Sequence, residues 1–312
     1  MASYVERDGD WVLRPPGRLE HVNMHLFALR AGRAETQALC DKFINVPTKN
    51  AVRASPLFPE FPFVLLTCAD IAKGYSEDVD DAHFGWMTER DVGFFLPVTL
   101  EWNGQRRVAN LLPYLYVDNF VAVLIGREVF GFPKVLADIE FGGPSWKCNV
   151  TSTVSVTSNP TQPAGPGTIL TVVQQTALPG IPLPSELDEA LKVFIDALRL
   201  ALGLPREDHA PFAKIPMVFL KEFRDATNRT TACHQSVVLA EAGIDGFYGG
   251  EMWLLPPLPL FHPFSITIPP YYSVDIVKYL GLDTGPTIHP LVAARVAIDF
   301  ELPFGSTLWA AP

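Results

Sequence analysis

The chain has 312 residues, of which 48% are hydrophobic and 19% are charged, and its formal net charge is −10. This composition allows a large buried core and argues against intrinsic disorder. The negative charge argues against partners such as nucleic acid or an anionic membrane surface, so we expect a small-molecule or protein partner.

Short apolar runs separated by proline and glycine predict a β-rich fold. In chain order, we predict strands at 62–68, 94–101, 111–117, 120–125, 136–141, 149–157, 168–174, 216–221, 234–241 and 294–302. The segment 158–167 is predicted to be the loop of a long hairpin. Polar and apolar residues alternate from His21 through His25, which also favours a strand there and argues against a helical metal-binding pair.

Two segments have the apolar spacing of amphipathic helices, 33–45 and 185–204. In the second, Ser185 can cap the first turn, and Gly203 marks the end. We expect the predicted strands and helices to form a single domain that spans residues 1–312.

The sequence has no glycine-rich phosphate loop, no HExxH motif and no Gly-x-Ser-x-Gly motif. The acidic segment 74–83, with Asp78, Asp80 and Asp81, lacks the ligand spacing of a calcium loop, so we interpret it as a solvated turn. We therefore expect neither a metal nor another cofactor.

The cysteines are Cys40, Cys68, Cys148 and Cys233, and none of them forms a CxxC pair. We interpret them as buried thiols of a protein in a reducing compartment. The sequence contains no apolar stretch long enough for a transmembrane helix and no apolar signal-peptide core near its start. We accordingly expect a cytoplasmic protein.

One lysine has unusual neighbours, in the sequence GREVFGFPKVLA at 126–137. Lys134 follows two phenylalanines, and Gly131 and Pro133 favour a bend with a fixed direction of approach. Burial lowers the pKa of an amine, and a neutral amine attacks a carbonyl to give a Schiff base. The alternative is a surface lysine whose stem packs on apolar residues.

The segment 114–141, YLYVDNFVAVLIGREVFGFPKVLADIEF, resembles the acetoacetate decarboxylase superfamily in its DN, GRE and aromatic-Pro-Lys motifs. The sequence GWMTER at 85–90, followed by FFLPVTLEWNG, resembles the family segment that carries an acidic active-site residue. Segments 216–223, 233–243 and 294–309 resemble the C-terminal half of the family.

The resemblance implies that Lys134 is a Schiff-base lysine and that Glu89 contacts the substrate and transfers protons. It also implies a β-rich α+β fold, in which a closed, cone-like antiparallel β-barrel with flanking helices surrounds an interior active site. A homo-oligomer that acts on a small carbonyl or keto-acid substrate is expected on the same basis.

Three positions depart from the family pattern. Val135 replaces a second lysine, Val22–Asn23 lacks an arginine that contacts the substrate carboxylate, and Val64–Thr67 lacks a second acid. By residue type, Arg30, Arg107 and Arg127 could replace the missing arginine. We favour a structural ion pair with Glu128 over a catalytic role for Arg127.

These features support a carbon–carbon lyase that acts through a Lys134 imine, with decarboxylation of a β-keto acid larger than acetoacetate as the leading hypothesis. The alternatives are an aldolase-dehydratase that uses the same lysine and a non-catalytic protein that binds a hydrophobic ligand. Besides Lys134 and Glu89, the candidate substrate-binding residues are Arg127, Phe132, Phe130, Arg107 and Trp86. Together with Phe94, Phe95 and Trp253, the aromatic residues among them suggest an apolar substrate.

Overall fold

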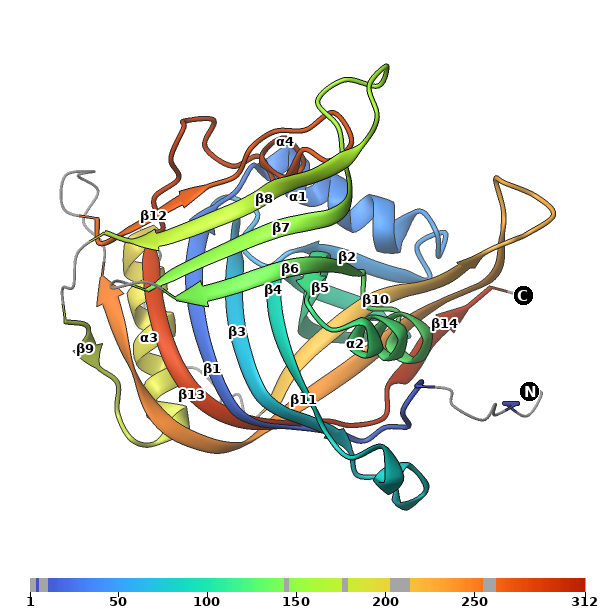
Figure 1. Cartoon of the computed structure of the whole chain (residues 1–312), viewed down its shortest axis with the longest axis horizontal. Helices are drawn as coiled ribbons and strands as arrows, with labels where there is room; N and C mark the ends of the chain where they lie inside the picture. Colours follow the sequence, from blue (N-terminus) through green and yellow to red (C-terminus); the bar gives the residue numbers. More distant parts are fainter. Residues whose placement is uncertain are drawn as a thin grey trace.

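The computed structural model describes residues 4–5, 11–142, 146–175, 179–202, 214–254 and 262–311 (Figure 1). Within these residues, 14 strands belong to one continuous sheet whose strands curve strongly. Most neighbouring strands are antiparallel, while β5 pairs in parallel with β6 and with β10. The sheet is therefore mixed, and it differs from the predicted antiparallel barrel at these two pairings.

Part of the sheet closes on itself, because β4 pairs with both β3 and β5. The ring consists, in spatial order, of β1 (Gly17–Arg30), β3 (Phe63–Ser76), β4 (Met87–Trp102), β5 (Gln105–Val117), β10 (Lys214–Arg224), β11 (Ala232–Leu254) and β13 (Val292–Leu302). The predicted closed, β-rich fold is confirmed. The segment from His21 to His25 lies in β1, as its alternating pattern indicates.

A second group of strands extends from β5 outside the ring. It consists of β6 (Lys134–Gly142), β7 (Lys147–Val156), β8 (Gly165–Gln174) and β12 (Phe264–Thr267). The predicted hairpin around 158–167 joins β7 to β8. The short strands β2 (Val52–Pro56), β9 (Ile181–Pro182) and β14 (Ser306–Ala310) complete the sheet.

The two predicted helices are present as α1 (Arg33–Cys40), which continues as a π-helical turn through Asn45, and α3 (Leu187–Leu202). Gly203, predicted to mark the end of the second helix, lies outside the described residues. A short helix, α4 (Ile276–Leu280), packs near α1. Among the described helices, none has the length and apolarity needed to cross a membrane.

The predicted strand at 120–125 is wrong, because this segment forms helix α2 (Phe120–Ile125). The side-chain oxygen of Asn119 accepts hydrogen bonds from the backbone N–H groups of Val121, at 2.9 Å, and Ala122, at 3.4 Å. Such a cap satisfies the first free donors of a helix, so it favours a helix over a strand. A short apolar run does not by itself distinguish the two structures.

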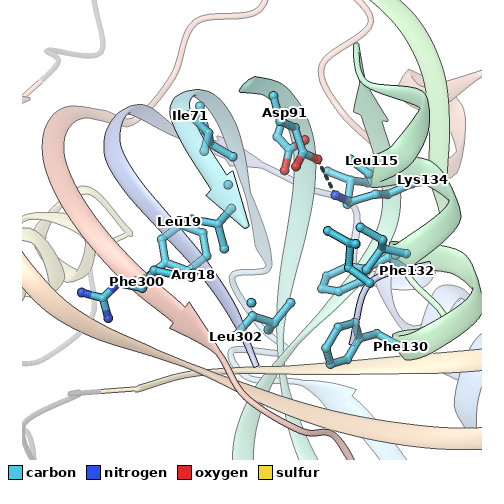
Figure 2. A pocket seen from close by; sticks show the side chains of 18 of the residues that line it. Arg18, Leu19, Ile71, Asp91, Leu115, Phe130, Phe132, Lys134, Phe300 and Leu302 are labelled. Atoms are coloured by element: carbon cyan, nitrogen blue, oxygen red, sulfur yellow. Dashed lines mark hydrogen bonds and ion pairs between the residues drawn. The ribbon is translucent and has the colours of Figure 1, made fainter. Parts of the chain in front are cut away.

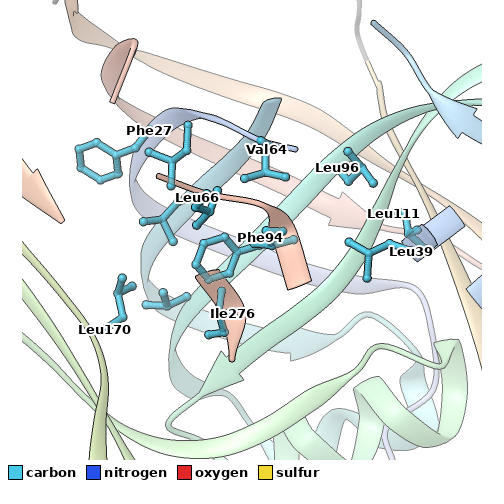
Figure 3. Packing of buried hydrophobic residues seen from close by; sticks show 14 of the residues in the cluster. Phe27, Leu39, Val64, Leu66, Phe94, Leu96, Leu111, Leu170 and Ile276 are labelled. Carbon is cyan, nitrogen blue, oxygen red and sulfur yellow. The ribbon is translucent and has the colours of Figure 1, made fainter. Parts of the chain in front are cut away.

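The main hydrophobic core lies between the ring and the outer strands and helices, with Phe27, Leu66, Phe94 and Ile276 among its residues (Figure 3). A second buried cluster gathers Leu112, Leu115, Phe130, Phe132 and Phe219 on the ring and on the segment after α2. Several residues of this second cluster line the same cavity as Lys134, so the cluster forms part of the candidate site.

Three of the four cysteines are buried as predicted, and Cys233 is exposed. Cys233 lies at the beginning of β11, where its thiol faces the carbonyl of Phe223 at 3.5 Å. The prediction that all four thiols are buried is therefore wrong at Cys233.

Candidate active site

The segment after α2 directs Lys134 into the ring. A π-helical turn (Gly126–Phe130) follows α2, and the N–H groups of Gly131 and Phe132 both donate to the carbonyl of Gly126 at 2.9 Å. Gly131 has φ of 86°, and a Cβ atom there would lie 2.6–3.0 Å from atoms of Lys221. Glycine therefore permits both the left-handed turn and the close packing against β10. Pro133 then leads into β6, whose first residue is Lys134.

Lys134 lines a cavity of about 160 Å³ at one end of the ring (Figure 2). Figure 2 shows Lys134 and Asp91 together at one end of this cavity, whereas most of the other labelled side chains are apolar, with Arg18 on the far side. The apolar walls include Leu19, Ile71, Leu115, Phe130, Phe132 and Phe300. The cavity thus joins a small polar end to a larger apolar space.

The amine of Lys134 contacts the carboxylate of Glu89 on β4 in an ion pair. Their side chains are 11% and 4% exposed, so water screens the pair little. The amine also lies 5.7 Å from the ring centre of Phe132. The structure thus brings together Lys134 and Glu89, which are 45 residues apart in the sequence.

The electrostatic surroundings raise the pKa of Lys134, which differs from the sequence-based expectation. Burial alone lowers this pKa, as expected, but the negative charges of Asp91 and Glu89 and the hydrogen bond to Glu89 outweigh burial. In the unliganded protein, Lys134 is therefore an ammonium group at neutral pH. It must lose a proton before it can attack a carbonyl, and Glu89 is the base in contact with it.

Asp91 is a site residue that the sequence analysis missed. It lies two residues after Glu89 on β4, so the two side chains point to the same face of the strand. Burial, followed by the negative charge of Glu89, raises the pKa of Asp91 well above its ordinary value. The alternation of an extended strand was the signal that could have revealed it.

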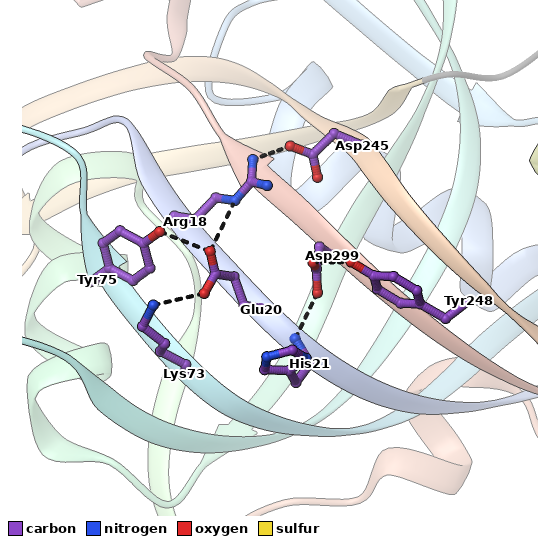
Figure 4. Close-up of polar contacts among 8 residues, drawn as sticks. All are labelled: Arg18, Glu20, His21, Lys73, Tyr75, Asp245, Tyr248 and Asp299. Carbon is purple, nitrogen blue, oxygen red and sulfur yellow. Dashed lines mark hydrogen bonds and ion pairs between the residues drawn. The ribbon is translucent and has the colours of Figure 1, made fainter.

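The arginines that reach the cavity are Arg14 and Arg18, not the three that the sequence suggested. Arg14 forms an ion pair with Asp81, which is buried rather than in a solvated turn as predicted. In Figure 2, the guanidinium of Arg18 points away from Lys134. Figure 4 shows that Arg18 pairs with Asp245 and with Glu20, the latter at 3.8 Å.

Glu20 belongs to a wider polar network on the strands around the cavity (Figure 4). It accepts hydrogen bonds from Lys73 at 2.8 Å and from Tyr75 at 2.9 Å. Nearby, Asp299 accepts hydrogen bonds from the hydroxyl of Tyr248 and from the backbone N–H of His21, both at 2.6 Å. The positive charge of Arg18 is thus engaged with carboxylates before any ligand binds.

Of the predicted substrate-binding residues, Phe130 and Phe132 line the cavity, whereas Arg107, Arg127 and Trp86 do not. Arg107 pairs with Glu241 at 3.2 Å, and Trp86 is 61% exposed. Arg127 donates to the backbone carbonyl of Lys134 at 3.3 Å and lines a second pocket. Arg107 and Arg127 were predicted to bind substrate from their residue type alone, and residue type does not determine where a side chain points.

Other predicted contacts differ as well. Glu128 accepts a hydrogen bond from Tyr4 at 2.7 Å, and the described residues show no ion pair between Glu128 and Arg127. Arg30 is exposed at the end of β1 and is not part of the cavity wall. Of the predicted aromatic residues, Phe95 lines the cavity, while Phe94 and Trp253 belong to the main core.

The three departures from the family pattern occupy different places. Val135 is 40% exposed and lies outside the cavity, as the alternation of β6 requires. Within Val64–Thr67, the segment that lacks the second acid of the family pattern, Thr67 lines the cavity, while Val22 is buried in a neighbouring cluster. Among the described residues, no group of His, Cys, Asp and Glu could hold a metal ion.

Gly126 offers a test of how closely the position of Lys134 is constrained. A Cβ atom at Gly126 would lie 2.6 Å from Cδ of Lys134, although Gly126 has ordinary helical dihedral angles. In Gly126→Ala, we expect lower thermal stability, because displacement of the lysine side chain weakens its buried ion pair with Glu89. We also expect a loss of Lys134 reactivity of about 10- to 100-fold, because the amine is displaced. The rate of adduct formation with a ketone and borohydride measures this effect.

The matched control for this variant is Gly243→Ala, since a Cβ atom at Gly243 meets no atom within 4 Å. Equal reactivity of the two variants would show that the contact between Gly126 and Lys134 does not position the amine.

The sequence comparisons identify one family. The model of the family described as acetoacetate decarboxylase matches residues 48–159, which include Glu89, Asp91 and Lys134. No curated protein matches the sequence significantly.

Solved structures show the same fold over nearly the whole chain. Acetoacetate decarboxylase from Legionella pneumophila is 14% identical, with a TM-score of 0.58 over 95% of this chain and 88% of that chain. The enduracididine biosynthesis enzyme MppR, complexed with pyruvate, is 12% identical, with a TM-score of 0.57 over 95% and 91%. An acetoacetate decarboxylase-like enzyme from Sphingomonas wittichii is 12% identical, with a TM-score of 0.58 over 99% of both chains.

At these identities, the structural likeness establishes the fold alone, while the family model covers the central segment that carries the lysine. Together, the family match over residues 48–159 and the shared fold confirm the resemblance of this chain to the acetoacetate decarboxylase superfamily.

Proposed function

We propose that this protein is a carbon–carbon lyase that forms an imine between Lys134 and a carbonyl compound with a large apolar portion. The observation that carries this proposal is the ion pair between Lys134 and Glu89 at one end of a mainly apolar cavity. The ketone carbon would lie beside the amine, and the hydrocarbon portion would extend along the apolar walls.

Imine formation begins with transfer of a proton from Lys134 to Glu89. The neutral amine then attacks the carbonyl carbon, and the resulting carbinolamine loses its hydroxyl group as water when Glu89 returns a proton. The product is a protonated imine. Because both partners of the ion pair are buried, exchange of the proton between them leaves no isolated charge in the cavity.

The favoured reaction is decarboxylation of a β-keto acid larger than acetoacetate. In the imine of such an acid, the bond between the α-carbon and the carboxylate breaks, CO₂ leaves, and the electron pair passes to the protonated imine. An enamine remains, which takes up one proton at carbon, and water then releases the ketone and the free lysine. The apolar walls favour a substrate with a hydrocarbon chain over the smaller acetoacetate.

Aldol condensation with dehydration is a second candidate, and the charges around the cavity favour it. A substrate carboxylate requires a cationic partner when it is buried. Arg14 and Arg18 are already paired with Asp81 and Asp245, so a carbonyl donor without a carboxylate suits the cavity as well. The MppR structure with the condensation product of pyruvate and imidazole 4-carboxaldehyde has the same fold.

Borohydride trapping tests the proposal. The protein is incubated with borohydride and either 3-oxooctanoate or 2-heptanone, and intact mass and peptide mapping locate any adduct. We expect a reduced adduct on Lys134 with both compounds. Absence of an adduct across a panel of ketones, keto acids and aldehydes would contradict the proposal and leave a non-catalytic role in binding hydrophobic ligands.

The two candidate reactions are separated by their products. Release of CO₂ from 3-oxooctanoate above the rate of the Lys134→Ala variant indicates decarboxylation. A conjugated enone absorbance, formed from a ketone and an apolar aldehyde or from pyruvate and an aldehyde, indicates aldol condensation with dehydration.

A further inference from the structure

The cavity contains a second carboxylate for which imine formation has no use. Asp91 lies on the same face of β4 as Glu89, and Figure 2 shows it beside the end of Lys134. We infer that Asp91 is a second catalytic acid, which donates the proton that the enamine carbon takes up. This inference rests on the imine chemistry proposed for Lys134.

The hydrogen bonding of Asp91 is incomplete. Its Oδ1 atom is buried and has no hydrogen-bond partner in the described part of the chain. A buried oxygen without a partner costs free energy of folding, so such atoms are uncommon unless they serve a function. A ligand in the cavity is the partner that this geometry leaves room for, since Asp91 forms part of the cavity wall.

The two carboxylates of β4 differ in their partners. Glu89 has the ammonium of Lys134 in contact with it, whereas Asp91 has no such contact. Two neighbouring buried carboxyl groups rarely both ionise, and the one with the cation keeps its charge. Glu89 is therefore suited to act as the base, and Asp91, whose pKa is raised, is suited to be a neutral acid near neutral pH. Asp91 adds its negative charge beside Lys134 only at the more alkaline pH at which it ionises.

The charged groups that face Asp91 are Glu89 on β4, Lys134 on β6 and Asp118 after β5. Arg14 and Arg18 from the opposite wall are held by their own carboxylates. Burial raises the pKa of Asp91 most, Glu89 and Asp118 raise it further, and Lys134 lowers it. Conversion of Lys134 to an imine keeps one positive charge in the cavity, so this balance persists during the reaction.

The proton balance of the step is complete. After CO₂ leaves, the enamine carbon forms a bond to the proton of the Asp91 carboxyl group, and the nitrogen regains its protonated-imine form. Asp91 becomes a carboxylate, and the cycle closes when it takes a proton from water. In the reverse direction, the carboxylate of Asp91 removes an α-proton from the imine of a ketone.

This reverse step gives an assay that requires no knowledge of the natural substrate. The protein is incubated with 2-heptanone in D₂O, and the exchange of the α-hydrogens is followed by NMR. The same ketone with borohydride measures imine formation at Lys134 separately. We expect Asp91→Asn to form the adduct within a few-fold of the wild-type rate and to lose exchange by about 100-fold or more.

Matched controls define the result. Asp138→Asn changes an exposed acid on β6, outside the cavity, and should leave adduct formation and exchange unchanged. Glu89→Gln should slow both, because it acts before the imine forms. If Asp91→Asn exchanged α-hydrogens at the wild-type rate per adduct, the assignment of Asp91 would be overturned. If the wild type formed no adduct, the proposed function would fail first.

Thermal stability tests whether Asp91 has a purely structural role. The folded-state pKa of Asp91 is raised, so its contribution to stability is present below its ordinary pKa and is lost as pH rises through the folded-state value. An asparagine at position 91 cannot ionise, so Asp91→Asn does not lose stability at high pH. The variant should therefore melt at the same or a higher temperature than the wild type at pH 8. Loss of exchange together with a lower melting temperature and a slow adduct would instead show a structural role for Asp91 and overturn the assignment.

Discussion

Replacement of Lys134 by alanine is expected to abolish adduct formation with every carbonyl compound and to reduce turnover by at least about 10⁴-fold, because no other nucleophile described in the cavity can form the imine. The amine is the atom to which the substrate becomes bonded, so its loss removes the reaction path rather than slowing one step. Intact mass after borohydride treatment and the rate of CO₂ release measure the two effects.

Lys221 provides the control for this variant. It is a partly buried lysine on β10 whose amine donates to the carbonyl of Val129 at 3.2 Å, outside the cavity. Burial lowers the pKa of Lys221, so this residue is the most plausible site for an adduct that does not depend on Lys134. Lys221→Ala should retain the adduct, and an adduct that disappeared only in Lys221→Ala would contradict the assignment of Lys134.

Removal of Lys134 also changes stability. Its pKa is raised in the folded protein, so its contribution to stability is complete at neutral pH and is lost only when alkaline pH exceeds that value. In Lys134→Ala, Glu89 remains buried without its cation, which typically costs about 3–5 kcal/mol of unfolding free energy. Adduct formation should therefore be measured below the melting temperature of the variant, where the folded state is intact.

The sequence was sufficient to predict that Lys134 and Glu89 meet in one cavity, while their catalytic roles stay predictions. The order of Gly131, Pro133 and Lys134 beside phenylalanines indicates a bend that buries one amine. Glu89 was predicted from the resemblance of residues 85–90 to the acetoacetate decarboxylase superfamily. The ring of strands brings these residues together through the pairing of β4 with β5 and of β5 with β6. That pairing joins distant segments, so the local sequence could not supply the distance between the two groups.

The remainder of the site depended on directions that the sequence does not encode locally. Arg107 and Arg127 have the residue type expected of a carboxylate partner, yet their strand and turn direct them away from the cavity. Arg14 and Arg18 reach it, but Asp81 and Asp245 neutralise them. The pKa of Lys134 is raised rather than lowered because Asp91 and Glu89 together outweigh the effect of burial.

Replacement of Glu89 by glutamine should shift the reactivity of Lys134 to lower pH and reduce its maximum. Glu89 is one of two carboxylates that hold the pKa of Lys134 above its ordinary value. Without that charge, burial has a greater effect, the pKa falls, and the neutral amine appears at lower pH. The same variant lacks the base that accepts the proton of the amine, so the highest rate should fall by about 100-fold or more.

These two effects are separated by the initial rate of adduct formation with 2-heptanone, measured from pH 5 to pH 11. The midpoint of the acid limb reports the pKa of the amine, and the plateau reports proton transfer. Glu128→Gln is the control, since Glu128 bonds to Tyr4 outside the cavity and should change neither quantity. An unchanged midpoint in Glu89→Gln would mean that the ion pair does not set the pKa of Lys134, and an unchanged plateau would mean that another group accepts its proton.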